Sequence, residues 1–494
     1  MRTRWILASF VFAASAAAAQ EPVDRAMIAK IRAEGLERSR AWSMLDTLAT
    51  VMGPRLSASP AYLRAATWAR DHLQAWGLRD VHFETWPFGR GWELDKMTLE
   101  MTAPRYMPLI GYPDAWSAST RGDVAGQPLL IAGMPADTLE RMRARLKGAI
   151  VLTQPLQTNF VREDRVQPTD AGAPPATPPA PATGRGGGRG GGRGGAPSEA
   201  SRIAALLHDA DVGAVIKTSR GEHGTVFLQT RDAGANAVPT IVMAGEHYNN
   251  ILRLMKNGVP VTLRVNVQGR YLTRDTSGYN VIAEMPGTDP RLRDEVVMIG
   301  AHLDSWHSAT GATDNADGAA VVLEVMRILK TIGAQPRRTI RVALWGGEEQ
   351  GLFGSAAWVA QHLAGEANAA ARDKLSVYFN LDPGSGPVYG FYSEGNQAAM
   401  SIFDAWLEPF KDIGARKNLI SGIGNTDHLS FTRQGLPGFN PIQDYVGYDV
   451  RMHHTNMDTM ERMREDDLKQ SAVVMASFVY HAAMRDAPIP RAPR

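Results

Sequence analysis

The chain has 494 residues, which is enough for two or three domains and a large buried core. It carries 53 Lys and Arg against 51 Asp and Glu, so its charge gives no argument for nucleic acid or an anionic membrane as a partner. It contains no cysteine, which excludes thiolate metal sites, and any bound metal must therefore rely on His, Asp and Glu side chains.

The N-terminus has the layout of a secretory signal peptide. Two arginines precede an apolar stretch that ends in small residues with an A-x-A pattern, MRTRWILASFVFAASAAAAQ. We predict that residues 1–19 are a signal peptide cleaved after Ala19, and that the mature protein is secreted or periplasmic. A membrane anchor is disfavoured because the apolar run is short, and no later segment approaches the ~20 apolar residues of a spanning helix.

The next residues, 20–120, contain two helical patterns and a strand. Helices are expected in RAMIAKIRAEGLERSRAWSMLDTLATVMG and in SPAYLRAATWARDHLQAWGL, which has Pro60 near its start and Gly77 at its end. The alternation in VHFETWPF then predicts a strand.

Between residues 121 and 270 the pattern changes to short β-rich runs, among them QPLLIAG, GAIVLTQ, GAVIKTS, PTIVMAG and VTLRVNVQG. Short helical segments separate these runs, which predicts a smaller, separate unit. Residues 168–200 within it are rich in Pro, Ala, Gly and Arg and cannot bury a core. We interpret them as a disordered, solvated loop; their three arginines in an exported chain make RNA binding the weaker alternative.

From about residue 277 strands and helices alternate regularly. Apolar runs such as DEVVMIGAHLD, RRTIRVALWG and LSVYFNLD are expected strands, and ADGAAVVLEVMRILKTIG is an expected helix. This alternation predicts a three-layer α/β/α domain with a mixed, largely parallel sheet, formed by residues 20–120 and 271–494. Sites in such sheets lie beyond the carboxyl ends of the strands.

Several of these expected strands end in acidic or imidazole side chains. They supply His302, Asp304, the adjacent Glu348 and Glu349, and Asp382. Taken singly, each has a structural explanation, such as a hydrogen-bonded histidine or a solvated glutamate pair. Together they concentrate negative charge at one edge of the sheet, which is costly unless cations bind there.

The set is large enough for two metal ions bridged by a carboxylate. Asp314, just before an expected helix, is placed to bridge, and a later loop, RMHHTNMDTM, adds His453, His454 and Asp458. In this arrangement His302 and Asp382 complete one site, and Glu349 and His454 the other. Glu348 is then left free to act as the general base.

The ordered motifs HLDSW, GATDN, EEQGLFGS, NLDPGSG and HHTNMDT resemble the co-catalytic zinc exopeptidases. These include secreted bacterial aminopeptidases, carboxypeptidase Q and glutamate carboxypeptidase, and the forms HLDSW and HHTNMDTM look closest to the carboxypeptidase Q branch. The smaller unit at residues 121–270 resembles the protease-associated domain that interrupts the peptidase domain in many of these proteins.

This resemblance implies a zinc-dependent exopeptidase with two Zn²⁺ per chain and a peptide substrate. It implies that the ions are bound by His302, Asp314, Glu349, Asp382 and His454, with Asp314 bridging. Glu348 matches the general base, and Asp304 matches a carboxylate that orients a ligand imidazole. His453 is the weaker match because His454 directly precedes TNMDT. A cis peptide between Asp314 and Asn315 is also implied.

One departure concerns the group that stabilises the oxyanion. The aminopeptidase branch often places a tyrosine before its SDH motif, whereas Ile423 occupies that position in SGIGNTDHLSF. Tyr445 or Tyr448 could replace it, and the spacing does not decide between them.

Two other functions remain as alternatives: a single-zinc acyl transferase like glutaminyl cyclase, and a catalytically inactive, receptor-like binding protein. The complete set of candidate ligands disfavours both. The sequence leaves open whether the amino or the carboxyl end of a peptide is recognised. It also leaves two roles for the smaller unit, covering the cleft or forming a homodimer.

Overall fold

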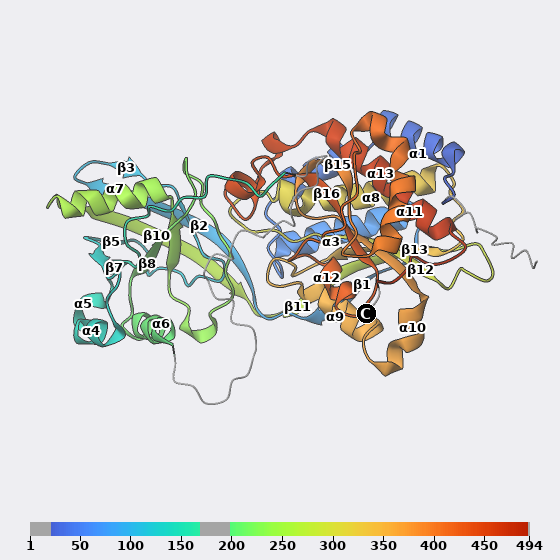
Figure 1. Ribbon diagram of the computed structural model, residues 1–494. Coiled ribbons are helices and arrows are strands. Elements are labelled where there is room, and N and C mark those ends of the chain that lie inside the picture. The colour runs from blue at the N-terminus through green and yellow to red at the C-terminus, as the bar shows by residue number, and fades with distance from the viewer. Residues whose placement is uncertain (1–20, 168–197, 493–494) are drawn as a thin grey trace, which may run out of the picture.

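The computed structural model describes residues 21–167 and 198–492 (Figure 1). The predicted signal peptide and most of the predicted loop at 168–200 lie outside these residues. In the described part, no helix has both the length and the apolar character needed to cross a membrane. Figure 1 shows a larger unit, which contains both ends of the described chain, and a smaller unit beside it.

The larger unit is built on a seven-stranded sheet. In spatial order its strands are β1 (Arg79–Pro87), β11 (Ser277–Met285), β13 (Thr339–Trp345), β12 (Val296–His302), β14 (Leu375–Asn380), β16 (Gly438–Asp444) and β15 (Ser385–Tyr392). Parallel pairing is confined to β13, β12, β14 and β16, while β1, β11 and β15 pair antiparallel. The sheet is therefore mixed, and its parallel strands form the centre, where helical crossovers connect them.

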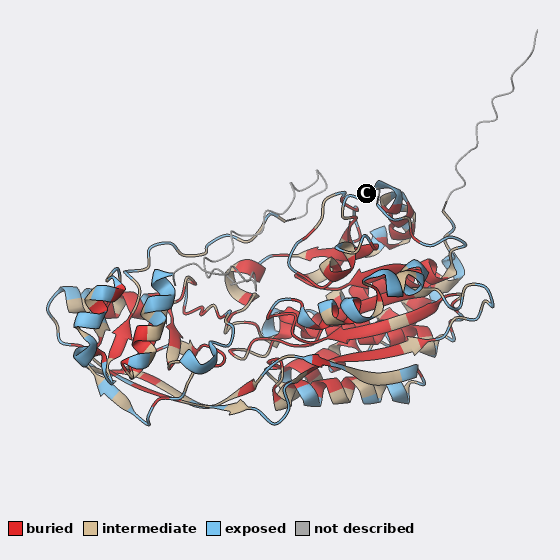
Figure 2. Ribbon diagram, turned by 90° about the horizontal axis from the view of Figure 1, so that it is seen from below, coloured by how far each residue is buried: buried red, intermediate tan, exposed pale blue. Residues whose placement is uncertain are grey.

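Helices cover both faces of this sheet. They are α1 (Arg25–Glu37), α2 (Ala41–Asp46), α3 (Pro60–Ala75), α8 (Asp317–Thr331), α9 (Phe353–His362), α10 (Ala369–Lys374), α11 (Gln397–Leu407), α12 (His428–Thr432) and α13 (Glu465–Met484). Side chains alternate along each strand, so Val297 and Ile299 pack against α1, α8 and α13, whereas Met298 packs with residues of α9 and α12 on the other face. The predicted three-layer α/β/α architecture is confirmed, and Figure 2 shows buried residues concentrated in its sheet.

The smaller unit contains two further sheets. A four-stranded sheet has the order β3 (Met107–Pro108), β2 (Gly91–Ala103), β10 (Thr262–Leu272) and β5 (Val124–Gly126). A five-stranded sheet has the order β4 (Gly111–Pro113), β9 (Thr240–Met243), β8 (Ala214–Thr218), β7 (Ile150–Leu152) and β6 (Leu129–Leu130). The helices are α4 (Ala136–Arg141), α5 (Arg143–Leu146), α6 (Glu199–Asp209) and α7 (Gly245–Lys256).

Strand β2 lies before residue 121, yet it pairs with β10 along its length. The strand pairing thus extends the smaller unit toward residue 91, further than composition alone indicated. The physical reason is that β2 and β10 share one apolar cluster, in which Leu99 and Met101 pack with Leu263 and Val265.

Candidate active site

Three neighbouring strands end at the edge of the sheet where the candidate residues gather. His302 is the last residue of β12, Glu348 follows β13, and Asp382 follows β14. Because β12 pairs in parallel with both β13 and β14, the carboxyl ends of all three strands meet at one edge. The sheet therefore brings together residues that are up to 80 positions apart in the sequence.

His302, Asp314 and Asp382 form the first of two groups suited to a metal ion. The Nε2 atom of His302 lies 3.2 Å from Oδ1 of Asp314 and 3.7 Å from Oδ1 of Asp382. One ligand atom from each of the three residues lies within 4.8 Å of the others, and all three side chains are buried. This spacing suits a single ion held between them.

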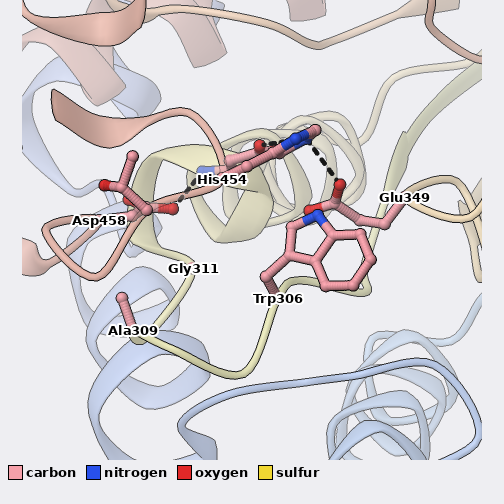
Figure 3. Close-up of a pocket in the computed structure, with 8 residues that line it drawn as sticks. Trp306, Ala309, Gly311, Glu349, His454 and Asp458 are labelled. Carbon is pink, nitrogen blue, oxygen red and sulfur yellow. Dashed lines mark hydrogen bonds and ion pairs between the residues drawn. The ribbon is translucent and has the colours of Figure 1, made fainter. Parts of the chain in front are cut away.

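Glu349 and His454 form the second group, which shares Asp314 with the first. The Nε2 atom of His454 lies 2.8 Å from Oε2 of Glu349 and 3.5 Å from Oδ2 of Asp314. The two oxygens of Asp314 thus face different histidines. Figure 3 shows Glu349 and His454 joined beside Trp306, at a small pocket that Asp314 and Asp458 also line.

Several atoms of these groups are buried and, apart from their ion pairs with one another, have no hydrogen-bond partner among the residues that the structure describes. They are His302 Nε2, Asp314 Oδ2 and both carboxylate oxygens of Glu349. Buried polar atoms are rarely left unpaired, since desolvation then costs free energy that no interaction offsets. Nitrogen and carboxylate oxygen donors converging in this way fit divalent zinc.

The ring of His302 is oriented by the residue two positions later. Its Nδ1 hydrogen-bonds to the main-chain carbonyl of Asp304 at 3.0 Å, which leaves Nε2 as the ligand atom of the neutral ring. The side chain of Asp304 has its nearer oxygen 3.6 Å from this Nδ1.

The carboxylate of Asp304 also holds the two adjacent glutamates. It accepts hydrogen bonds from the backbone N–H groups of Glu348 at 3.3 Å and Glu349 at 3.4 Å, and from Ser57 Oγ at 2.7 Å. The resemblance implied that the Asp304 carboxylate orients a ligand imidazole; its hydrogen bonds to Glu348 and Glu349 depend on the fold.

Glu348 lies beside the first group with its Oε2 atom 4.0 Å from Nε2 of His302. Burial raises the pKa of Glu348 well above its ordinary value, and the nearby charges of Asp382 and Asp427 raise it further. Asp427 is itself buried, and burial with the neighbouring carboxylates raises its pKa to about 7. Asp427 lies in the stretch SGIGNTDHLSF, and no sequence feature there marks it as a site residue.

The two adjacent histidines differ in their contacts. His454 pairs with Glu349 and Asp314, whereas the ring of His453 stacks on Tyr448 with centroids 5.3 Å apart. A nitrogen of His453 still lies within 4.8 Å of the ligand atoms of Asp314 and His454. Contacts with carboxylates therefore favour His454 as the ligand without removing His453 from the site.

The two tyrosines left open by the sequence also differ. The hydroxyl of Tyr445 lies 3.2 Å from that of Tyr392. The hydroxyl of Tyr448 is buried with no hydrogen-bond partner in the described part of the chain. Burial raises the pKa of Tyr448, and the charges of Asp314 and Asp382 raise it further.

Asp458 supports the loop that carries Asp314. Its carboxylate accepts hydrogen bonds from Thr313 N at 2.7 Å, Thr313 Oγ1 at 2.8 Å and Asp314 N at 3.1 Å. The peptide bond between Asp314 and Asn315 is cis, as expected. The motif HHTNMDTM contains Asp458, but the sequence did not indicate that Asp458 contacts Thr313 and Asp314.

Arg55 supports the same region from the other side and was not singled out in the sequence. Its side chain is fully buried and donates to the main-chain carbonyls of Leu303 at 2.9 Å, Thr310 at 2.8 Å and Gly311 at 2.8 Å. Burial lowers the pKa of Arg55 to about 10. Nothing in its surroundings, GPRLSAS, indicates this role.

The chain is similar in sequence to several peptidases. Residues 280–479 match the sequence model of Peptidase family M28. The chain is 26% identical to mouse carboxypeptidase Q over 473 residues, which cover 95% of this chain and 91% of that protein. It is 33% identical to leupeptin-inactivating enzyme 1 of Streptomyces exfoliatus over 228 residues, 42% of this chain and 50% of that protein.

Solved structures show the same fold. A peptidase M28 precursor from Shewanella amazonensis has a TM-score of 0.70 at 23% identity, over 95% of this chain and 99% of that one. A zinc aminopeptidase from Bacillus subtilis has a TM-score of 0.59 at 19% identity, over 91% of this chain and 96% of that one.

The family match and the carboxypeptidase Q relative support a metallo-exopeptidase, and the α/β/α fold with its converging carboxylates and imidazoles fits that class. The family match covers the strands that carry His302, Glu348 and Asp382 as well as the loop with His454. Residues 280–479, which carry all of the candidate ligands, belong to peptidase family M28.

Proposed function

We propose that this protein is a di-zinc exopeptidase, in which His302 and Asp382 hold one ion and Glu349 and His454 the other. The observation that carries the proposal is the position of Asp314, whose two oxygens lie 3.2 Å and 3.5 Å from the two different histidines. A carboxylate between two nitrogen donors is the arrangement expected of a bridging ligand.

In this proposal Glu348 is the general base. When bound, the two ions would acidify a water molecule and polarise the scissile carbonyl. Glu348 takes a proton from the water molecule while the water oxygen attacks the carbonyl carbon. It then passes that proton to the amine nitrogen as the C–N bond breaks. The position of Glu348 supports this role, since its Oε2 atom lies 4.0 Å from Nε2 of His302, beside the candidate ligands.

Tyr448 is the proposed stabiliser of the oxyanion. Its hydroxyl is buried with no hydrogen-bond partner among the described residues, and its ring stacks on His453, which is next to His454. The hydroxyl of Tyr445 is less suited because it already contacts Tyr392. A donor that is free before substrate binds can turn to the developing negative charge.

Zinc itself is supported by the donor set and by the solved zinc aminopeptidase that shares the fold. A single-zinc acyl transferase is less favoured because both ligand groups retain competent side chains. A binding-only role is disfavoured for the same reason and because Glu348 is retained beside them.

We also propose that the enzyme is secreted or periplasmic, from the layout of residues 1–19, and that the smaller unit is an inserted protease-associated domain.

The carboxypeptidase Q relatives and the aminopeptidase neighbours point to opposite ends of a peptide as the recognised terminus.

Two measurements test this function. Zinc counted per folded chain should be two, and hydrolysis of dipeptides should stop with a chelator and return with Zn²⁺. A dipeptide panel blocked at either the amine or the carboxylate then identifies the terminus. One ion per chain would favour the acyl transferase, and a fully loaded protein that cleaves no peptide would remove the proposed activity.

A further inference from the structure

A segment of the smaller unit, residues 164–167, lies against the loop formed by residues 445–456. This loop carries Tyr448 and His454. The carboxylate of Asp164 accepts the backbone N–H groups of Gly447 at 2.7 Å and Val450 at 3.1 Å. The smaller unit thus satisfies polar backbone groups of the loop that the loop itself leaves unpaired. Gln167 adds a third contact through its side-chain oxygen, which accepts the N–H of Tyr445 at 2.9 Å.

Arg165 forms the centre of this contact through an ion pair with Asp449. Its Nε and Nη2 atoms donate to the two carboxylate oxygens of Asp449 at 2.8 Å and 2.6 Å, and its backbone N–H donates at 2.8 Å. The side chains are only 10% and 4% exposed. A buried, bidentate pair of this kind fixes the orientation of both groups, whereas an exposed pair contributes little.

The guanidinium of Arg165 also lies over two aromatic rings, with its central carbon 4.7 Å from the ring centroid of Tyr445 and 5.4 Å from that of Tyr448. The ring of Tyr448 stacks on His453, and the centroid of His453 lies 3.8 Å from that of His454. A continuous row of contacts therefore runs from the smaller unit to the candidate ligand.

A second contact holds the end of the same loop. Leu228 N donates to the carbonyl of His454 at 2.8 Å, and Val226 N donates to the side chain of Asn456 at 2.7 Å. Phe227 pairs with Thr455 as an isolated antiparallel bridge. The loop is thus fastened to the smaller unit at both of its ends.

We propose that Arg165 is a positioning residue of the active site, which sets Tyr448 and His454 against the metal centre from within the smaller unit. This inference rests on the proposed function, because it assigns roles to Tyr448 and His454. It gives the smaller unit a part in catalysis through the loop it holds. Lysine could not replace Arg165, because an ammonium group offers neither the planar stack on the tyrosines nor the bidentate pair.

The test uses Arg165→Met and Arg165→Lys in the full-length zinc-loaded enzyme. Both should lower kcat by about 10- to 100-fold, since the donor and the ligand are displaced from their positions. Two further readouts do not depend on turnover. Hydrogen exchange in peptides spanning residues 445–456 should become at least about 10-fold faster, as expected for lost packing. One of the two zinc ions should also be lost to a chelator more readily.

Arg162→Met is the matched control. Arg162 lies three residues away, is 63% exposed and pairs with Glu222 at 2.9 Å, so its loss should change none of these measurements. The double variant Arg165→Met/Asp449→Asn separates positioning from charge balance. It removes both buried charges and should regain thermal stability over Arg165→Met, while kcat stays low.

Wild-type exchange and kcat in Arg165→Met would overturn the inference, as would a double variant that regains both stability and kcat. Should Arg165→Met not fold, Arg165→Lys, which keeps the positive charge but not the bidentate pair, carries the same expectations and the same contrary outcome. If the wild type bound no zinc or cleaved no peptide, the proposed function would fail, and hydrogen exchange alone would still decide whether the loop is held.

Discussion

Asp458 accepts the backbone N–H of Asp314 at 3.1 Å and thereby orients a carboxylate that lies between two histidines. Its other oxygen accepts both donors of Thr313. Burial and the neighbouring Asp314 raise the pKa of Asp458 to about 7. The hydrogen bonds therefore hold the carboxylate at a buried position where its ionised form is destabilised.

We expect Asp458→Ala to weaken metal binding by about 10- to 100-fold, as loss of outer partners of metal ligands typically does. Titration against a competing chelator measures this. Asp466→Ala is the control, because the Asp466 side chain is 97% exposed at the start of α13. Equal metal affinity in the two variants would show that Asp458 does not orient the bridge.

Glu348→Gln should keep zinc content near that of the wild type and lower kcat by at least ~100-fold, because the amide cannot accept a proton. Metal analysis and dipeptide kinetics on the same preparation check both parts. Glu349→Gln gives the contrast, since it removes a proposed ligand and should reduce zinc content. Normal turnover in Glu348→Gln with both ions present would remove Glu348 as the base.

Asp314→Ala should lose zinc from both groups, because each group shares this carboxylate. Saturating Zn²⁺ at 100 times its Kd stabilises a folded protein by about 2.7 kcal/mol per site, so the wild type should melt higher with zinc than with a chelator. The variant should show little of this difference. Retention of two ions would refute the bridge.

Tyr448→Phe should lower kcat by about 10- to 100-fold with little change in KM, because a hydroxyl that contacts only the oxyanion acts in the transition state. Tyr445→Phe is the matched control in the same loop, and its hydroxyl contacts Tyr392 instead. Steady-state kinetics on one dipeptide compares the two. The reverse order of effects would assign the role to Tyr445.

The buried His307 should lower the free energy of unfolding in acid. Its Nε2 hydrogen-bonds to the carbonyl of Pro113 in the smaller unit at 2.9 Å, and burial lowers its pKa from 6.5 to about 4. As pH falls below 6.5 the unfolded chain takes up a proton that the folded protein resists. The contribution of His307 to the free energy of unfolding is therefore complete above pH 6.5. It decreases toward pH 4, by at most about 3 kcal/mol.

Urea unfolding of the metal-free protein at pH 7 and pH 4.5 measures this loss. His307→Gln retains an N–H donor for Pro113 and should lose less stability in acid than the wild type. His82→Gln changes a histidine whose side chain is 41% exposed and serves as the control. An unchanged difference between the two pH values in His307→Gln would contradict the prediction.

Much of the fold could be read from the sequence because many strands and helices of the larger unit are marked by a short apolar run or a helical pattern. The run VVMIGAH is apolar and short, and the strand that it forms is buried on both faces. The smaller unit was harder to delimit. Strand β2 has no local feature that assigns it to β10 rather than to the seven-stranded sheet, because pairing between distant strands depends on tertiary packing.

The sequence by itself determined which residues have the chemistry for metal binding, since strands ending in His302, Glu348 and Asp382 must meet when they pair in parallel. Only the tertiary structure decided how their neighbours act on them. The hydroxyl of Tyr448 is left without a partner while that of Tyr445 has one, and Arg165 reaches the same loop from another unit. Arg165 and Tyr448 are 283 positions apart in the sequence, and no local sequence pattern specifies a contact at that separation.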